Sequence, residues 1–293
     1  MFSLAGIANP ALLVGEVSAK EQIGEAHTGA AVQDIEFISG DATLSGSLVL
    51  PAEGSAPRAV VVFVHGSGPQ ERSLPLAKYF ARSGIGAFVY DKRGVGKSGG
   101  RYEAAQAVSG HNIDRLAEDA AAALAALRER SALDGAALGL AGISQAGWIA
   151  PLAAHKSGLA EFLLLWSGPV CKVSEEDIFS KYTNDRDTRG VPSYAEALAA
   201  RKSPYRWPDF LGIDSDPSTS LRRLSTPGLW IFGGQDGSIP VDLSMERLDV
   251  LRGEGLPYEY VLFSESGHNN IPETFATAVG WLERLLESSE EPN

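Results

Sequence analysis

The stretch ALGLAGISQAGWIAPLAA, residues 137–154, decides the fold of this chain. Its first five residues are an apolar run typical of a buried strand, and a helix is expected from near Gly147. Between them stands Ser144, with the small residues Gly142 and Ala146 two positions before and two positions after it. A sharp strand-to-helix turn of this kind exposes the serine and directs the helix N-terminus at its surroundings. A serine at a helix start is also a common N-cap, so the interpretation of Ser144 as a nucleophile depends on the rest of the chain.

On both sides of this stretch, short apolar runs alternate with helical patterns, as in βα units around a mostly parallel sheet. Residues 59–65 form a continuous apolar run, which is expected of a central strand covered on both faces. Residues 33–39 and 43–50 are expected to pair as a hairpin. The other predicted strands are 86–90, 137–141, 162–166, 229–233 and 258–263, which gives about eight strands. The predicted helices are 73–82, 113–130, one from near 147, 241–252 and 271–287. The fold class is therefore α/β.

Between Gly168 and Pro227 this alternation stops, and the chain becomes polar, proline-bearing and aromatic. A structureless loop of that length would be unusual inside a compact domain, so we predict an inserted helical lid. Its aromatic side chains include Trp207 and Phe210, which could line a substrate pocket or pack within the lid itself. The predicted domain limits are 33–168 and 227–290 for the core, 169–226 for the lid, and 1–32 for an N-terminal segment without an assigned structure.

A nucleophilic serine needs a base and an acid that orients the base, and both are expected at the ends of later strands. Asp236 lies just past strand 229–233, and His268 lies just past strand 258–263. The carboxyl ends of parallel strands meet at one edge of the sheet, so Ser144, Asp236 and His268 are expected to meet there.

Donors for the oxyanion of a tetrahedral intermediate are expected from two backbone segments. The backbone N–H of Gln145 faces it from the start of the helix after Ser144. The loop His65-Gly66-Ser67-Gly68-Pro69 follows the third strand, and its glycines permit inward-pointing N–H groups. We predict the Ser67 N–H as the second donor, with Gly66 as the neighbouring option and as a residue that contacts the substrate.

Taken together, VHGSGP, YDKRGVGKSGG and GISQAGWIAPLAA resemble the corresponding motifs of bacterial α/β-hydrolase fold enzymes, and the resemblance runs from about residue 33 to 290. Within that superfamily the chain resembles esterases and relatives of the serine aminopeptidases of the S33 type. Alanine at 146 departs from the second glycine of the Gly-x-Ser-x-Gly pattern. The resemblance implies an α/β-hydrolase fold, with Ser144 as nucleophile, Asp236 as acid, His268 as base, and Ser67 and Gln145 in the oxyanion hole.

The resulting hypothesis is a serine hydrolase that cleaves small carboxylic esters through an acyl-enzyme, with no cofactor and no metal. A peptidase, an aminopeptidase or a thioesterase would use the same triad, and Glu175, Glu176 and Asp177 could hold a substrate amine or form a solvated face. A non-catalytic ligand-binding relative of the same fold is a third class, against which the complete triad argues.

Several other residues suggest chemistry but lack the context for it. Residues 94–99 fit G-x-G-x-x-G, but no helix opens at residue 100, so we expect a structural loop near the site. Asp91 is an alternative acid, although it precedes the nucleophile strand. His65 is expected to shape its loop, and Cys171 to pack rather than react. The remaining histidines, His27, His111 and His155, are expected in loops or on the surface.

Composition excludes several classes of protein. The 37 acidic and 25 basic residues give a net charge of −12, which disfavours a nucleic-acid partner. A single cysteine rules out an intrachain disulfide and a cysteine-based metal cluster.

The apolar start, residues 1–15, faintly resembles a secretory signal but lacks a basic n-region, so we expect a surface-packed segment. No run of 18 apolar residues occurs, and we expect a cytoplasmic protein, with a secreted or periplasmic one as the alternative.

Overall fold

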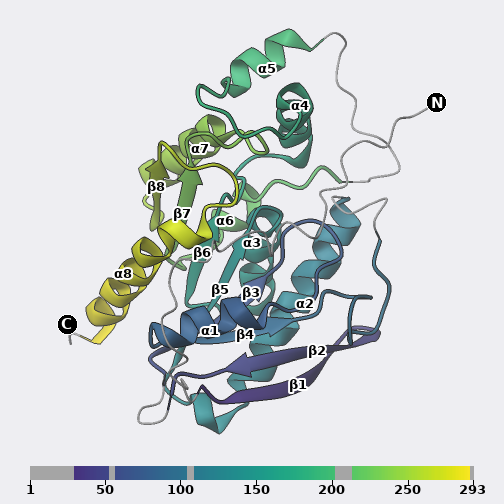
Figure 1. Cartoon of the computed structure of the whole chain (residues 1–293), viewed down its shortest axis with the longest axis vertical. Coiled ribbons are helices and arrows are strands. Elements are labelled where there is room, and N and C mark those ends of the chain that lie inside the picture. The colour runs from purple at the N-terminus through teal and green to yellow at the C-terminus, as the bar shows by residue number, and fades with distance from the viewer. Residues whose placement is uncertain (1–29, 53–56, 104–108, 202–212, 291–293) are drawn as a thin grey trace, which may run out of the picture.

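The protein is represented by a computed structural model, which describes residues 30–52, 57–103, 109–201 and 213–290. Eight strands form a sheet in the order β1-β2-β4-β3-β5-β6-β7-β8 (Figure 1). The strands are β1 (Val32–Ser39), β2 (Ala42–Val49), β3 (Ala59–Val64), β4 (Gly86–Tyr90), β5 (Ala137–Ile143), β6 (Phe162–Trp166), β7 (Gly228–Gly233) and β8 (Tyr258–Phe263). The β1–β2 hairpin is antiparallel and joins β4 antiparallel, whereas every pair from β4 to β8 is parallel. The predicted α/β class and the number of strands are confirmed.

Helices cover both faces of this sheet and create two apolar layers. The helices are α1 (Leu74–Arg82), α2 (Gly110–Arg128), α3 (Ala146–Ser157), α4 (Val173–Thr183), α5 (Tyr194–Ala200), α6 (Ser218–Leu221), α7 (Val241–Gly253) and α8 (Ile271–Glu290), with a short 3-10 turn, η3 (Ser131–Leu133). Helices α1 and α8 pack on one face, where Phe80, Trp166 and Phe275 lie together. Helices α2, α3 and α7 pack on the other. Since both faces are covered, β3 is buried along its whole length, as its continuous apolar sequence predicts.

Most elements differ from the sequence prediction by one to three residues at an end, and two of these differences have a clear local cause. Helix α2 begins at Gly110 rather than Ile113, because the Ser109 hydroxyl accepts a hydrogen bond from the Asn112 N–H and caps the helix. Strand β5 continues to Ile143, because its last residues pair with the end of β6. The strand therefore runs up to the residue before Ser144.

The insertion after β6 contains helices α4, α5 and α6, of which α4 and α5 stand above the carboxyl ends of the strands (Figure 1). It is attached to α7 by a 2.6 Å ion pair between Glu175 and Arg247 and by a 2.9 Å hydrogen bond from the Tyr194 N–H to Asp242. A cavity of about 330 Å³ lies along this contact, lined in part by Phe179, Met245 and Leu262. The predictions for Trp207, Phe210 and residues 1–29 concern positions outside the described residues.

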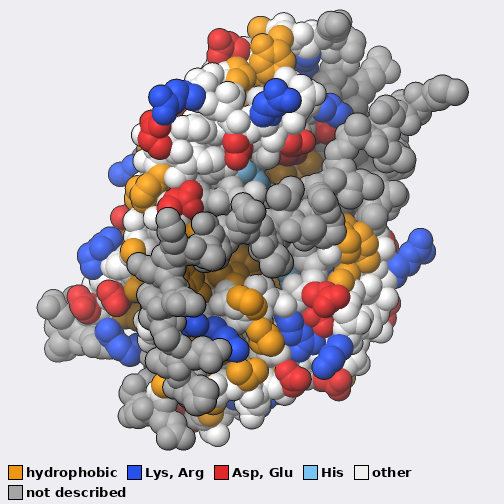
Figure 2. All heavy atoms as spheres, in the orientation of Figure 1, with side chains coloured by type: hydrophobic (Ala, Val, Ile, Leu, Met, Phe, Trp, Pro, Cys, Tyr) orange, Lys and Arg blue, Asp and Glu red, His pale blue; other side chains and the backbone are white. Residues whose placement is uncertain are grey.

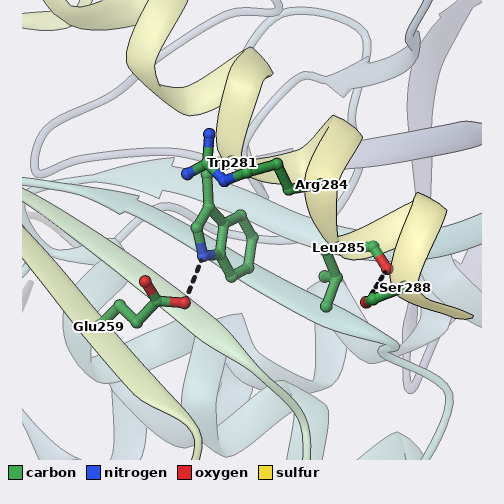
Figure 3. Close-up of a pocket in the computed structure, with 5 residues that line it drawn as sticks. All are labelled: Glu259, Trp281, Arg284, Leu285 and Ser288. Atoms are coloured by element: carbon green, nitrogen blue, oxygen red, sulfur yellow. Dashed lines mark hydrogen bonds between the residues drawn. The ribbon is translucent and has the colours of Figure 1, made fainter.

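A second, smaller pocket lies between β8 and α8 (Figure 3). The indole of Trp281 points from α8 toward Glu259 and donates a 2.8 Å hydrogen bond to its carboxylate. Glu259 lies near the amino end of β8, whereas His268 follows the carboxyl end of the same strand. This pocket is therefore at the opposite end of the strand from the candidate active site. In the part of the chain that the structure describes, no helix has the length and apolar character needed to cross a membrane.

Candidate active site

Ser144 occupies the turn between β5 and α3 in a left-handed backbone conformation, with φ at +57°. A side chain in this region costs roughly 1–2 kcal/mol relative to ordinary helical geometry, so the surrounding structure must hold it there. The Ser144 N–H donates to the Trp166 carbonyl at 3.0 Å, and its own carbonyl accepts from the Gly147 N–H at 2.8 Å. The conformation predicted from the sequence, a sharp turn that presents the serine, is present.

Gly142 permits this turn because there is no room for a side chain at that position. A Cβ added there would lie 2.5 Å from the Ala146 Cβ and 2.7 Å from the Val64 carbonyl oxygen. Both distances are far below van der Waals contact, so the close approach of β3, β5 and α3 requires glycine. The small side chain of Ala146 is needed for the same reason.

Asp236 is completely buried in the loop after β7, and its two carboxylate oxygens have separate partners. Oδ1 accepts the backbone N–H groups of Ser238 and Ile239 at 2.8 and 3.1 Å. Oδ2 lies 2.8 Å from Nδ1 of His268. The backbone thus fixes the carboxylate, and the carboxylate in turn fixes the orientation of the imidazole ring.

The environment of His268 changes its pKa in two opposing directions. Burial lowers the pKa, while the charge and hydrogen bond of Asp236 and the charges of Asp187 and Asp185 raise it; the net effect is a pKa above the ordinary 6.5. The histidine is therefore a stronger base than a free imidazole. Figure 2 shows a recessed histidine side chain with acidic side chains above it on the same face.

Ser144 and His268 are linked through the end of β6. The Trp166 carbonyl accepts the Ser144 N–H, and the next residue, Ser167, donates its hydroxyl to the His268 carbonyl at 2.8 Å. Ser167 is itself held by a 2.8 Å hydrogen bond from its N–H to the Ile231 carbonyl in β7. The loops that follow β5, β7 and β8 therefore lie at one edge of the sheet.

Asp187, in the insertion, holds together the loops that carry Asp236 and His268, and no pattern in the sequence marks it. Its carboxylate accepts the N–H of Gly237, next to Asp236, at 3.0 Å and the N–H of His268 at 2.9 Å. A Cβ added to Gly267 would lie 2.1 Å from the same carboxylate, so the two loops close tightly around it. The insertion therefore contributes directly to the geometry of the site.

The loop after β3 approaches Ser144 closely, since a Cβ added at Gly66 would lie 3.5 Å from the Ser144 Cβ. Its carbonyl groups accept hydrogen bonds from side chains outside the loop. The Gln70 side chain donates to the Ser67 carbonyl at 2.7 Å, and the Lys92 ammonium donates to the carbonyls of Gly66 and Gly68. Gln145 is the N-cap residue of α3 and directly follows Ser144, so both backbone segments predicted for the oxyanion hole border the serine.

The alternative chemical residues have structural partners instead. Asp91 accepts two hydrogen bonds from the Arg72 side chain, at 3.0 and 2.8 Å, and one from the Lys97 N–H, whereas it is Asp236 that contacts His268. Burial, together with the charge of Lys92, lowers the pKa of His65 to about 3, which keeps its ring neutral beneath the loop.

The glycine-rich segment 94–99 is also part of the framework. It closes as a turn through a 2.9 Å hydrogen bond from the Gly94 N–H to the Gly99 carbonyl, and it is anchored to β2 by the Gly99 N–H. Cys171 is buried.

This fold, with a serine in a strained turn between strand and helix, defines the chain as a serine hydrolase of the α/β-hydrolase class. A model of the family described as serine aminopeptidase, S33, matches residues 55–210, which is just over half of the chain. The chain belongs to this family.

Three relatives illustrate the range of activities with which this fold occurs. The Pyrococcus furiosus esterase Pf2001 superimposes with a TM-score of 0.62 at 20% identity, covering 87% of this chain and 91% of that one. The Pyrococcus horikoshii acylaminoacyl peptidase gives 0.61 at 19% identity, covering 90% and 42%. Acylamino-acid-releasing enzyme 2 of Oryza sativa subsp. japonica is 24% identical over 265 residues, which are 83% of this chain and 32% of that protein. The chain thus spans about a third of the length of this curated relative.

Proposed function

We propose that this chain is a serine esterase that hydrolyses small carboxylic esters through a covalent acyl-enzyme. The observation that carries the proposal is the hydrogen-bonded pair of buried Asp236 and half-buried His268, linked through Ser167 and Trp166 to the strained turn that presents Ser144. Full-length similarity to an esterase of this fold supports it, since 91% of that chain is covered.

In the proposed mechanism, His268 removes the hydroxyl proton of Ser144 as the oxygen attacks the ester carbonyl. Asp236 keeps the proton of the neutral imidazole on Nδ1, so that Nε2 is the base, and stabilises the cation that forms. The N–H groups of Ser67 and Gln145 stabilise the oxyanion, and His268 then protonates the departing alcohol. A water molecule activated by the same histidine attacks the acyl-enzyme and releases the acid.

The insertion is proposed to act as a lid over this site. Its attachment to α7 and the position of Asp187 between the acid and base loops support that role. Gly66, Trp207 and Phe210 remain the proposed substrate-contacting residues, the last two being outside the described residues.

The test is hydrolysis of p-nitrophenyl acetate, butyrate, octanoate and palmitate by the chain and by its Ser144→Ala variant. We expect turnover that falls with acyl length and drops by several orders of magnitude in the variant. Ser131→Ala, a change of an exposed serine in η3 before β5, is the matched control and should keep the wild-type rate. Esterase activity that survives in Ser144→Ala would refute the assignment.

A peptidase is the second candidate, and the acidic residues of the insertion near Asp236 favour it. Burial first, and then the charges of Asp177, Asp185 and Asp236, raise the pKa of Glu176 well above its usual range. Carboxylates of the insertion therefore crowd toward the acid of the triad, and the ammonium group of a peptide N-terminus would relieve their repulsion. Comparing a p-nitrophenyl ester with an aminoacyl p-nitroanilide separates the two candidates. Serine-dependent turnover of the anilide alone would replace the esterase by an aminopeptidase.

A further inference from the structure

Lys92 is a buried lysine that the proposed reaction does not use. It is the second residue after β4 and is only 2% exposed, and its backbone N–H donates to the Gln70 carbonyl at 3.0 Å. Burial lowers its pKa, and the charge of Asp119 opposes that shift. An ammonium group is costly to remove from water unless it is well bonded, so the partners of this one are informative.

All three N–H donors of the Lys92 ammonium go to the two backbone segments that border Ser144. Nζ lies 2.8 Å from the Gly66 carbonyl, 3.1 Å from the Gly68 carbonyl and 2.9 Å from Oε1 of Gln145. A lysine has three such donors, so this set uses its full capacity. The side chain thereby ties the loop after β3 to the N-cap residue of α3, which directly follows the proposed nucleophile.

These contacts determine which way the peptide between Gly66 and Ser67 faces. In a planar trans peptide the C=O and the N–H point in opposite directions, and no cis bond occurs in the described residues. With the Gly66 carbonyl bound to Lys92, the Ser67 N–H must point to the other side of the loop. Glycines at 66 and 68 would otherwise let this peptide rotate easily.

The positive charge of Lys92 also favours the binding of an oxyanion by the Ser67 N–H. The ammonium lies at the oxygen end of the peptide dipole, and an oxyanion bound to the Ser67 N–H would lie at the hydrogen end. A hydrogen bond at one end of a peptide polarises it and strengthens the hydrogen bond at the other end. The contribution is largest when a full negative charge forms, which happens only in the tetrahedral state.

We propose that Lys92 is a positioning residue of the oxyanion hole: by binding the carbonyls of Gly66 and Gly68 and the side chain of Gln145, it directs the Ser67 N–H toward the reacting oxygen. This inference rests on the proposed function, because it assumes that Ser144 is the nucleophile. It assigns Lys92 an effect on the transition state and no contact with the substrate.

The test compares Lys92→Met with wild type, using Lys97→Met as the matched control. Lys97 is an exposed lysine five residues further along the same loop. Three quantities are measured: kcat and KM on p-nitrophenyl butyrate, the inhibition constant of a trifluoromethyl ketone that forms a tetrahedral adduct, and the rate at which a fluorophosphonate labels Ser144. Loss of a direct oxyanion donor lowers kcat about 10²–10³-fold. For Lys92→Met we expect a loss of about 10–100-fold, since the donor remains but is misdirected.

A merely structural lysine and a positioning lysine differ in how these quantities change together. The proposal requires that kcat, inhibitor affinity and labelling rate fall by similar factors while KM stays within about twofold, since only interactions in the tetrahedral state are lost. Values equal to wild type, or a change in KM alone, would overturn it. If Lys92→Met does not fold, the same three quantities are measured on Lys92→Gln, whose side chain is neutral but keeps two N–H donors.

Failure of the inference can be distinguished from failure of the proposed function. If wild type is labelled at Ser144 and Lys92→Met reacts equally fast, only the role of Lys92 is lost. If wild type hydrolyses anilides instead of esters, the comparison is made on an anilide, because the oxyanion is the same. If wild-type Ser144 is not labelled at all, both proposals fall.

Discussion

Replacing Asp236 by asparagine reverses a hydrogen bond without changing the shape of the side chain. Oδ1 already accepts the N–H groups of Ser238 and Ile239, so the amide oxygen must take that position. The NH₂ group is then forced to face Nδ1 of His268, where Oδ2 stood at 2.8 Å. Nδ1 becomes an acceptor, the ring proton moves to Nε2, and the imidazole is no longer a base toward Ser144.

The size of the effect follows from what it costs to restore the active tautomer. Turning the amide over would place its NH₂ against two backbone donors and leave both without an acceptor. Each unsatisfied buried donor costs about 1–3 kcal/mol, which gives about 2–6 kcal/mol in total. At about 1.4 kcal/mol per tenfold change, this corresponds to a rate loss of about 30-fold to 2 × 10⁴-fold. Loss of the charge that stabilises the imidazolium adds to it, so we expect about 10³–10⁴-fold.

The assay is kcat/KM on p-nitrophenyl butyrate, together with unfolding in urea. Asp236→Asn should lose about 10³–10⁴-fold in kcat/KM while keeping a cooperative unfolding transition, because the amide oxygen still accepts both backbone N–H groups. Asp134→Asn, an exposed aspartate before the amino end of β5, is the matched control and should behave as wild type. A loss below about tenfold in folded Asp236→Asn would refute the reasoning about the tautomer.

Two further predictions concern the insertion and the nucleophile turn. Since only the neutral imidazole is a base, kcat/KM should rise with pH through the raised pKa of His268, above 6.5. Asp187→Asn removes one of the charges that raise this pKa, so the rise should move to lower pH. Asp134→Asn, an exposed change before β5, should leave the profile in place. An unmoved profile in Asp187→Asn would contradict the electrostatic role. Gly142→Ala should lower the free energy of unfolding by about 1–3 kcal/mol in urea titrations, because its Cβ overlaps two neighbours. A Cβ added at Gly253 would have no neighbouring atom within 4 Å, so Gly253→Ala should be neutral or stabilise the fold by up to about 1 kcal/mol. Equal effects of the two substitutions would show that the turn at Gly142 is not tightly packed.

Much of the fold could be read from the sequence because the signals are local. Apolar runs of strand length recur along the chain, and those at 86–90, 162–166 and 258–263 match β4, β6 and β8 residue for residue. The turn at Ser144 was also predictable, since glycine and alanine flank it where no larger side chain fits. The remaining differences are at the ends of elements, where a single cap such as Ser109 decides the boundary.

The candidate site was predictable only in part. The residue types and their order, serine, aspartate and histidine after successive strands, can be read from the sequence because parallel strands end at one edge of a sheet. The sequence also left Asp91 as a rival acid. Packing removes that ambiguity, because Arg72 binds Asp91 while the loop after β7 brings Asp236 to His268.

The α/β class, the succession of strands and helices, and the turn that presents Ser144 all follow from the sequence, since each depends on residues close together in the chain. The tertiary structure alone decided that Asp187 bridges the acid and base loops and that Lys92 holds Gly66 and Gln145. Both are ordinary polar residues in the sequence, and neither has a periodic or neighbouring pattern that marks it. Their roles arise from contacts across 26 to 81 positions of chain, which exist only once the sheet has assembled and brought those segments together.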